Sequence, residues 1–191
     1  MTPTPKKRGR PRVFDDAFVL ARATEIFLKL GYAGASLDAL TTAMGINKPS
    51  LYAAFGDKRQ LFVRVLEQLA AQRGHRYRAA FERGATLEAS LREVFLEAVE
   101  IYLGGDAPPG CLIVNGSTTE ALVDDGLAAL TREFFALTDR VVARWIVERA
   151  PAVSAAAALS LSRLVNGVIH DLALRARVGG PRADLCDYAR G

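Results

Sequence analysis

The sequence predicts an all-α protein, in which a three-helix headpiece is joined by a fourth helix to a larger helical bundle. Residues 36–55 fit two short helices with a tight turn, and from Thr86 onward apolar residues recur at helical spacing without strand-like alternation. With 191 residues and 50% apolar composition, the chain can bury a substantial core. We expect an arm over residues 1–13, a headpiece over residues 14–56 and a helical body over residues 57–191.

The arm is strongly basic, whereas the rest of the chain is nearly neutral. The first twelve residues carry five Lys or Arg side chains and no acid, which leaves twenty basic against twenty-one acidic residues in the remainder. Such a segment cannot bury enough apolar surface to order itself, so we expect it to be disordered. Its Arg-Gly-Arg-Pro core resembles an AT-hook, which makes Arg8, Arg10 and Arg12 candidate minor-groove contacts. The alternative is a solubilising or non-specific phosphate-binding tail.

The first two helices of the headpiece have recognisable ends. The first is expected over residues 15–30, because its apolar residues share one face and Gly31 stops it. Ser36 can accept a hydrogen bond from the first turn of the second helix. Gly45 ends that helix, since glycine adopts a positive φ without steric cost.

The third helix has an unusual outer face. Asn47 caps it, and Pro49 is tolerated in its first turn, where no intrahelical N–H bond is lost. Lys48, Ser50 and Tyr52 project outward as a donor-rich surface of the kind that reads a DNA major groove. The alternative is an ordinary helical hairpin of a globular core, which would not need these side chains behind a basic arm.

A longer sequence pattern supports the interpretation that the third helix reads DNA. Residues 43–58 read Ala-Met-Gly-Ile-Asn-Lys-Pro-Ser-Leu-Tyr-Ala-Ala-Phe-Gly-Asp-Lys, preceded by Gly-Arg-Pro-Arg at residues 9–12. This pattern resembles the TetR family of bacterial transcriptional repressors. The resemblance implies a cytoplasmic homodimer that binds a pseudo-palindromic double-stranded DNA operator and is released by a small-molecule effector, with no catalytic activity and no cofactor.

The fourth helix begins after Asp57, with Gln60 at the position of a capping-box partner. Lys58 lies in its first turn, where the helix dipole and unbonded N–H groups favour a phosphate. The alternative is an ordinary solvated lysine. With Thr41 and Pro49, Lys58 completes the candidate DNA contacts.

Further helices are expected in the body over residues 86–103, 112–122, 124–150, 154–178 and 184–189. Polar and aromatic side chains in this region suit the lining of a cavity between helices. The candidates are Tyr102, Cys111, Asn115, Trp145, Asn166 and His170. The alternative is that they serve only ordinary packing within the body.

Cys111 lies just before an apolar helix start, where N–H dipoles favour a reactive thiolate. A similar Gly-Cys-Leu sequence recurs at this place in a branch of the TetR family, and some members of that branch sense oxidants or electrophiles through the cysteine. The resemblance therefore offers an alternative function, a thiol-based redox or electrophile-responsive regulator. The competing interpretation is a small buried hydrophobic residue.

The helix over residues 154–178 is apolar around much of its circumference, which requires two partners. One is the body of its own subunit, and the resemblance implies that the other is the same helix of a second subunit. The candidate dimer contacts are Leu161, Leu164, Val165, Val168 and Leu172.

Other function classes find little support. No apolar run reaches the roughly 18 residues of a membrane span, and no metal is expected because Cys111, Cys186 and the two histidines form no close ligand pair. The two cysteines exclude a disulfide framework and suit a reducing cytoplasm. No nucleophile elbow or phosphate loop is present. Two rivals stay open, an architectural minor-groove protein and a small-molecule or thiol-modifying enzyme.

Overall fold

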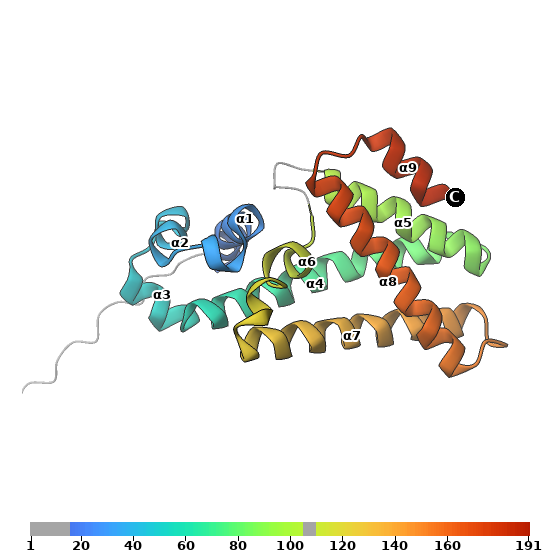
Figure 1. Ribbon diagram of the computed structural model, residues 1–191, viewed down its shortest axis with the longest axis horizontal. Helices are drawn as coiled ribbons and strands as arrows, with labels where there is room; N and C mark the ends of the chain where they lie inside the picture. Colours follow the sequence, from blue (N-terminus) through green and yellow to red (C-terminus); the bar gives the residue numbers. More distant parts are fainter. Residues whose placement is uncertain (1–15, 105–109) are drawn as a thin grey trace, which may run out of the picture.

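The computed structural model describes residues 16–104 and 110–191, and every regular element in these ranges is helical (Figure 1). The all-α prediction is confirmed. The elements are α1 (Asp16–Gly34), α2 (Leu37–Met44), α3 (Lys48–Phe55), α4 (Lys58–Arg83), α5 (Leu87–Leu103), α6 (Leu112–Gly116), the 3-10 turn η1 (Glu120–Leu122), α7 (Asp125–Arg149), α8 (Ala155–Arg177) and α9 (Arg182–Arg190).

Helices α1, α2 and α3 form a small headpiece at one end of the molecule (Figure 1). Each helix contributes one apolar face to a shared core, because apolar residues three or four apart lie on the same side of a helix. The buried members include Phe27, Leu40, Met44, Leu51 and Phe55. The short helices α2 and α3 are therefore held by tertiary packing, since helices of eight residues are marginal alone.

The expected end of the first helix is visible as a break in α1. Gly31 has φ 71° and ψ 179°, so the regular helix stops there and one further turn leads to Gly34. A residue with a side chain would be strained at this φ. The break brings Tyr32 close to Phe27, with ring centroids 6.3 Å apart.

Helix α4 links the headpiece to the body without interruption (Figure 1). It starts with the expected capping box, in which Asp57 accepts from the Gln60 N–H and the Gln60 side chain accepts from the Asp57 N–H. One turn later, the ring of Phe62 lies edge-on to Phe27 at 5.0 Å and to Tyr32 at 5.1 Å. This aromatic cluster attaches α1 to α4.

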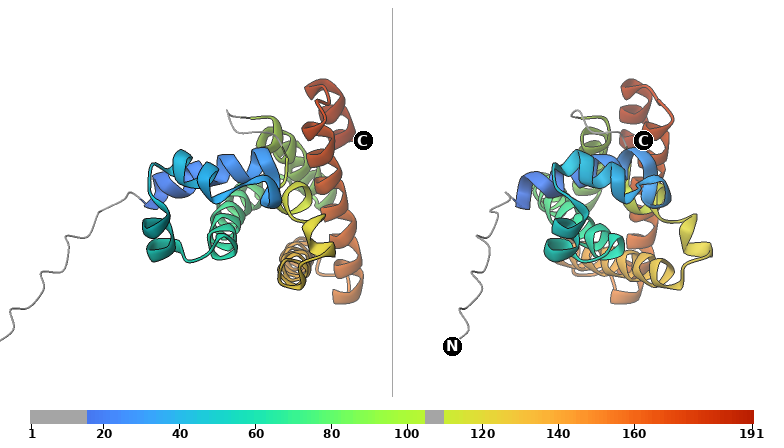
Figure 2. Two further views of the ribbon diagram at one scale, coloured as in Figure 1. Left: turned by 60° about the vertical axis from the view of Figure 1, so that its left-hand side comes forward. Right: turned by 90° about the vertical axis from the view of Figure 1, so that its left-hand side faces the viewer.

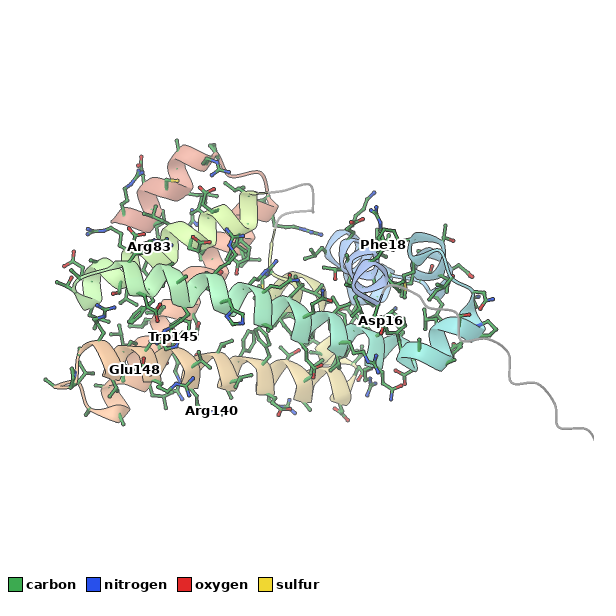
Figure 3. All side chains as sticks on the ribbon, turned by 180° about the vertical axis from the view of Figure 1, so that it is seen from behind. Asp16, Phe18, Arg83, Arg140, Trp145 and Glu148 are labelled. Carbon is green, nitrogen blue, oxygen red and sulfur yellow. The ribbon has the colours of Figure 1, made fainter. Side chains whose placement is uncertain are left out.

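The body is built around the C-terminal part of α4, with α5 packed on α4 and α7 packed on α8. Trp145 of α7 lies between α7 and α4 (Figure 3), and its ring centroid is 5.7 Å from that of Phe81 on α4. Helix α8 runs along the outer side of the body (Figure 2), and its C-terminal end reaches α1. The body core is continuous with that of the headpiece.

The helix expected over residues 112–122 is interrupted. Helix α6 ends at Gly116, and only the short turn η1 follows. The Ser117 hydroxyl donates to the Ile113 carbonyl and the Thr118 hydroxyl to the Val114 carbonyl. Such side-chain bonds compete with helix continuation, which accounts for the shorter helix.

Two glycine substitutions should have opposite effects on stability. Gly45 has φ +66° and Gly74 lies inside α4, and a Cβ at either position meets no atom within 4 Å. Gly45→Ala should lower the free energy of unfolding by about 1 kcal/mol through backbone strain, whereas Gly74→Ala should raise it by about 0.5–1 kcal/mol. Urea denaturation measures both, and changes of the same sign would contradict the backbone assignment.

Candidate functional site

The turn between α2 and α3 is fixed by its own capping groups. Ser36 Oγ accepts a hydrogen bond from the Ala39 N–H at 3.1 Å, and Asn47 Oδ1 accepts from the Ser50 N–H at 2.9 Å. Gly45 has a left-handed backbone conformation, and its N–H donates to carbonyl groups at the end of α2. These caps, predicted from the sequence, set the angle at which α3 leaves α2.

The outward face of α3 is exposed and rich in donors. Tyr52 is 50% exposed, Lys48 and Pro49 are exposed, and Ser50 is half-buried. Lys48 Nζ lies 2.7 Å from Asp38 Oδ1 of α2, and the hydrogen bond with this carboxylate raises the pKa of Lys48. Lys48 therefore carries a full positive charge at neutral pH, and its partner is a surface carboxylate that a phosphate can displace.

One predicted contact, Thr41, does not lie on this face. Thr41 is buried, and its hydroxyl donates to the Leu37 carbonyl at 2.8 Å, so it supports α2 from inside. The neighbouring Thr42 is exposed on the same helix and was not among the sequence candidates. Its exposure follows from the helical register of the buried Leu40, Thr41 and Met44.

Lys58 is half-buried at the junction of headpiece and body. Its Nζ lies 4.5 Å from the centroid of the Tyr32 ring and donates to the Ala33 carbonyl at 3.4 Å. Burial lowers its pKa. In this position Lys58 joins α4 to α1. The remaining candidates, Arg8, Arg10 and Arg12, lie outside the described residues.

Two arginines connect the headpiece side to the body. The Arg59 guanidinium bonds both carboxylate oxygens of Asp124, at 2.7 and 2.9 Å, and Asp124 also caps α7. Arg177, at the end of α8, donates to the carbonyls of Leu28 and Lys29 at the end of the first part of α1. Sequence reasoning missed these contacts because the partners are far apart in the chain. Arg177 thus ties the headpiece to α8, and Arg59 ties the start of α4 to α7.

The body encloses a cavity of about 230 Å³ between α4, α5, α6, α7 and α8. Five of the six predicted lining residues meet there, namely Tyr102, Cys111, Trp145, Asn166 and His170. The structure does not describe the side chain of the sixth, Asn115. Most of the wall is aliphatic or aromatic. Sequence reasoning missed three polar members, Arg73, Tyr77 and Thr138.

Polar groups cluster where α4 faces α5. The hydroxyl oxygens of Tyr77 and Tyr102 are 3.3 Å apart, and the Arg73 guanidinium carbon lies 5.3 Å from the centroid of the Tyr102 ring. Burial raises the pKa of Tyr77 to about 12 and that of Tyr102 well above its usual value. Both phenols therefore keep their protons at neutral pH.

The polar residues that line the cavity near α8 carry no net charge at neutral pH. Asn166 donates to Asp139 Oδ1 at 2.7 Å, which engages one N–H of its amide group. Burial lowers the pKa of His170, whose ring lies 5.2 Å from Phe135. His170 is therefore neutral near pH 7.

Cys111 precedes α6 and is 6% exposed. Its side chain makes no capping hydrogen bond, and it lines the cavity beside the Arg73, Tyr77 and Tyr102 cluster. A reagent can approach the thiol only where the cavity admits it.

The candidate dimer contacts divide between two faces of α8. Leu164 is 69% exposed, and Leu161 and Val168 are partly exposed. Val165 and Leu172 are buried in the subunit's own core, because they face α5 and α7. The outer face continues instead through Leu174 and Val178, which are 45% and 84% exposed.

The described ranges contain neither a cluster of metal ligands nor a membrane-spanning helix. No group of three or more His, Cys, Asp or Glu side chains there could hold a metal ion. None of the helices in those ranges combines the length and the apolar character needed to cross a membrane.

Residues 19–65 match the family model described as bacterial regulatory proteins, tetR family. The HTH-type transcriptional repressor ComR of Escherichia coli K12 is 28% identical over 188 residues, which span 96% of this chain and 90% of ComR. The repressor BdcR of the same organism is 27% identical over 181 residues, spanning 95% of this chain and 88% of BdcR. The TetR family transcriptional regulator CifR, solved as a cysteine-substituted variant with 26-base-pair double-strand operator DNA, has a TM-score of 0.80 at 31% identity, over 95% of this chain and 96% of that chain.

Proposed function

Because the chain belongs to the TetR family of DNA-binding transcriptional regulators, we propose that it is a homodimeric repressor released from its operator by a small molecule bound in the body cavity. The exposed face of α3 is the observation that carries the DNA-reading part. Lys48, Ser50 and Tyr52 present donors there, while Leu51 and Phe55 anchor the opposite face in the core. A rigid helix with exposed donors suits the major groove.

The described part of the headpiece reads bases, and the arm supplies backbone or minor-groove contacts. Lys48 and Pro49 lie at the N-terminus of α3, the end that enters the groove in this motif. Lys58 and the first turn of α4 lie near enough to serve a phosphate once DNA competes with the Ala33 carbonyl. The charges of Arg8, Arg10 and Arg12 make the DNA affinity fall more steeply as the salt concentration rises.

Dimerisation is supported by the outer face of α8. Leu164 and Leu174 on α8, and Val178 directly after it, are all exposed in the single chain. Large apolar side chains exposed along one helix are candidates for an interface. Two subunits paired through α8 would carry two headpieces, as a palindromic operator requires.

Release is supported by the way the cavity and the headpiece share α4. Arg73 and Tyr77 line the cavity, while Lys58 and Arg59 contact the headpiece and α7 from the same helix. A ligand that prefers one position of α4 therefore biases the headpiece. It weakens operator binding only by its difference in affinity for the two positions.

A second candidate is a regulator that senses oxidants or electrophiles through Cys111. The observation that favours it is the thiol's position in the cavity wall, where a small reagent that enters is held against it. Modification would add volume to a packed site between α4 and α6. The effect on α4 would resemble that of a bound ligand.

Removing the Tyr52 ring should weaken specific DNA binding without harming the fold. Tyr52→Ala is expected to lose about 1–3 kcal/mol of operator affinity, the amount typical of one base-reading contact. Its free energy of unfolding should change by less than about 0.5 kcal/mol, because the ring is half-exposed. Fluorescence anisotropy with a selected operator fragment measures the affinity, and Arg92→Ala on α5 is the control. Unchanged affinity would remove Tyr52 from the reading face.

A charge on the outer face of α8 should separate the subunits. Leu164→Glu is expected to shift the protein from dimer to monomer in sedimentation velocity, because it places a carboxylate in an apolar contact. Leu122→Glu, at a more exposed residue in η1, should leave the dimer intact. Dissociation by Leu122→Glu, or a dimer unaffected by Leu164→Glu, would place the interface elsewhere.

The thiol candidate predicts a cysteine-specific response. Hydrogen peroxide should then release operator DNA from the parent protein and from Cys186→Ser, but not from Cys111→Ser, in a gel-shift titration. Cys186 is the matched control because it is partly buried on α9. Release of the Cys111→Ser protein at the parent's peroxide concentration would dismiss the sensor role.

A further inference from the structure

Several polar groups of the cavity lie at one end, and some of their hydrogen-bond donors are not used within the protein. Arg73 spends one N–H on the Gly110 carbonyl at 3.3 Å and stacks its guanidinium over Tyr102. A guanidinium has five N–H donors and no acceptor. Further donors of Arg73 therefore stay available at the cavity wall.

The positive charge of Arg73 is not paired with a carboxylate in the part of the chain that the structure describes. Within residues 16–104 and 110–191, no carboxylate lies within ion-pair distance of its guanidinium. Its neighbours on α4 differ, because Arg76 pairs with Glu97 and Arg78 with both Glu82 and Glu148. A buried or half-buried charge is stabilised when a partner of opposite sign supplies hydrogen bonds.

The two phenols add to the same donor set. One hydroxyl donates to the other across 3.3 Å, so one proton of the Tyr77 and Tyr102 pair is left for a further acceptor. Their raised pKa values mean that neither oxygen competes as a phenolate. This end of the cavity therefore offers donors to a ligand that brings acceptors.

The rest of the wall suits an apolar group. It is formed by aliphatic and aromatic side chains, among them Leu66, Leu69, Val141, Trp145 and Ile169. The polar side chains nearer α8 are either engaged, as Asn166 is with Asp139, or neutral, as His170 is. At about 230 Å³ the cavity is smaller than those that enclose drug-sized ligands, roughly 300–1,000 Å³.

We propose that this cavity binds a small apolar monocarboxylate, with its carboxylate against Arg73 and the Tyr77 and Tyr102 hydroxyls and its apolar part among the side chains of α7 and α8. This inference rests on the proposed function, since it names the chemical class of the molecule that the cavity takes. A bidentate carboxylate matches the geometry of the guanidinium fork. An alcohol of the same skeleton would leave the charge of Arg73 without a partner.

The test compares acids with alcohols on the full-length protein. Isothermal titration calorimetry would use phenylacetate, 4-phenylbutyrate and hexanoate beside 2-phenylethanol, 4-phenylbutan-1-ol and hexan-1-ol. We expect at least one acid to bind at least tenfold more tightly than its alcohol. Equal affinities within every pair, or binding by no acid, would overturn the proposal.

Variants of α4 assign that preference to Arg73. Arg73→Met should abolish the preference for the acid while leaving the affinity for the alcohol within about twofold, and Arg73→Lys should retain part of it because the charge is kept. Arg76→Met is the matched control and should behave as the parent, since Arg76 is paired with Glu97 outside the cavity wall. An undiminished preference in folded Arg73→Met, checked by circular dichroism, would overturn the proposal.

A separate readout distinguishes this inference from the proposed function. The acid that binds is added to the complex of the protein with its operator fragment, and anisotropy reports release. Binding of the acid through Arg73 without any loss of operator affinity would support the ligand class and contradict effector-controlled release. Release by the alcohol as readily as by the acid would contradict the ligand class instead.

Discussion

The ring of Phe62, near the start of α4, is packed between Phe27 and Tyr32 of α1, and the orientation of the headpiece depends on this contact. Because α4 continues without a break into the body, the same helix carries the aromatic anchor at one end and part of the cavity wall further along. The headpiece has no second covalent route to the body. Its direction is therefore set by α4. Arg177 holds α1 against the end of α8, and Arg59 fixes the start of α4 to the start of α7.

This arrangement separates the tasks of the chain. The charge that favours DNA is concentrated in the arm, and α3 adds Lys48 and uncharged donors, whereas the body is nearly neutral and exposes apolar side chains on α8. The cavity in between holds one guanidinium and two neutral phenols at one end of a mostly apolar wall. The proposed sites of DNA reading, subunit pairing and ligand binding thus occupy different surfaces, and α4 is the element that touches the first and the third.

Local signals in the sequence predicted the local structure well. Ser36, Gly45 and Asn47 act within one turn of their own helices, so their roles could be predicted without a fold. Side-chain direction was harder. Thr41 lies inside because its hydroxyl can bond its own helix. Helix α8 is apolar on many sides, so the sequence did not show which of its faces is buried, and the burial of Val165 and Leu172 was not predicted. In the sequence, Arg73 and Tyr77 look like residues on the solvated face of a long polar helix. In the folded protein, α5 and α7 cover them.

The central claim is that two headpieces, fixed on their α4 helices and paired through α8, read DNA together. Selection of bound fragments from a random double-stranded DNA pool tests it most directly, because neither the operator nor the subunit geometry is assumed. The account predicts enrichment of an inverted repeat whose half-sites lie about 10 base pairs, one helical turn, or a multiple apart. Enrichment of a single half-site without symmetry, or no enrichment beyond A·T-rich sequence, would contradict it.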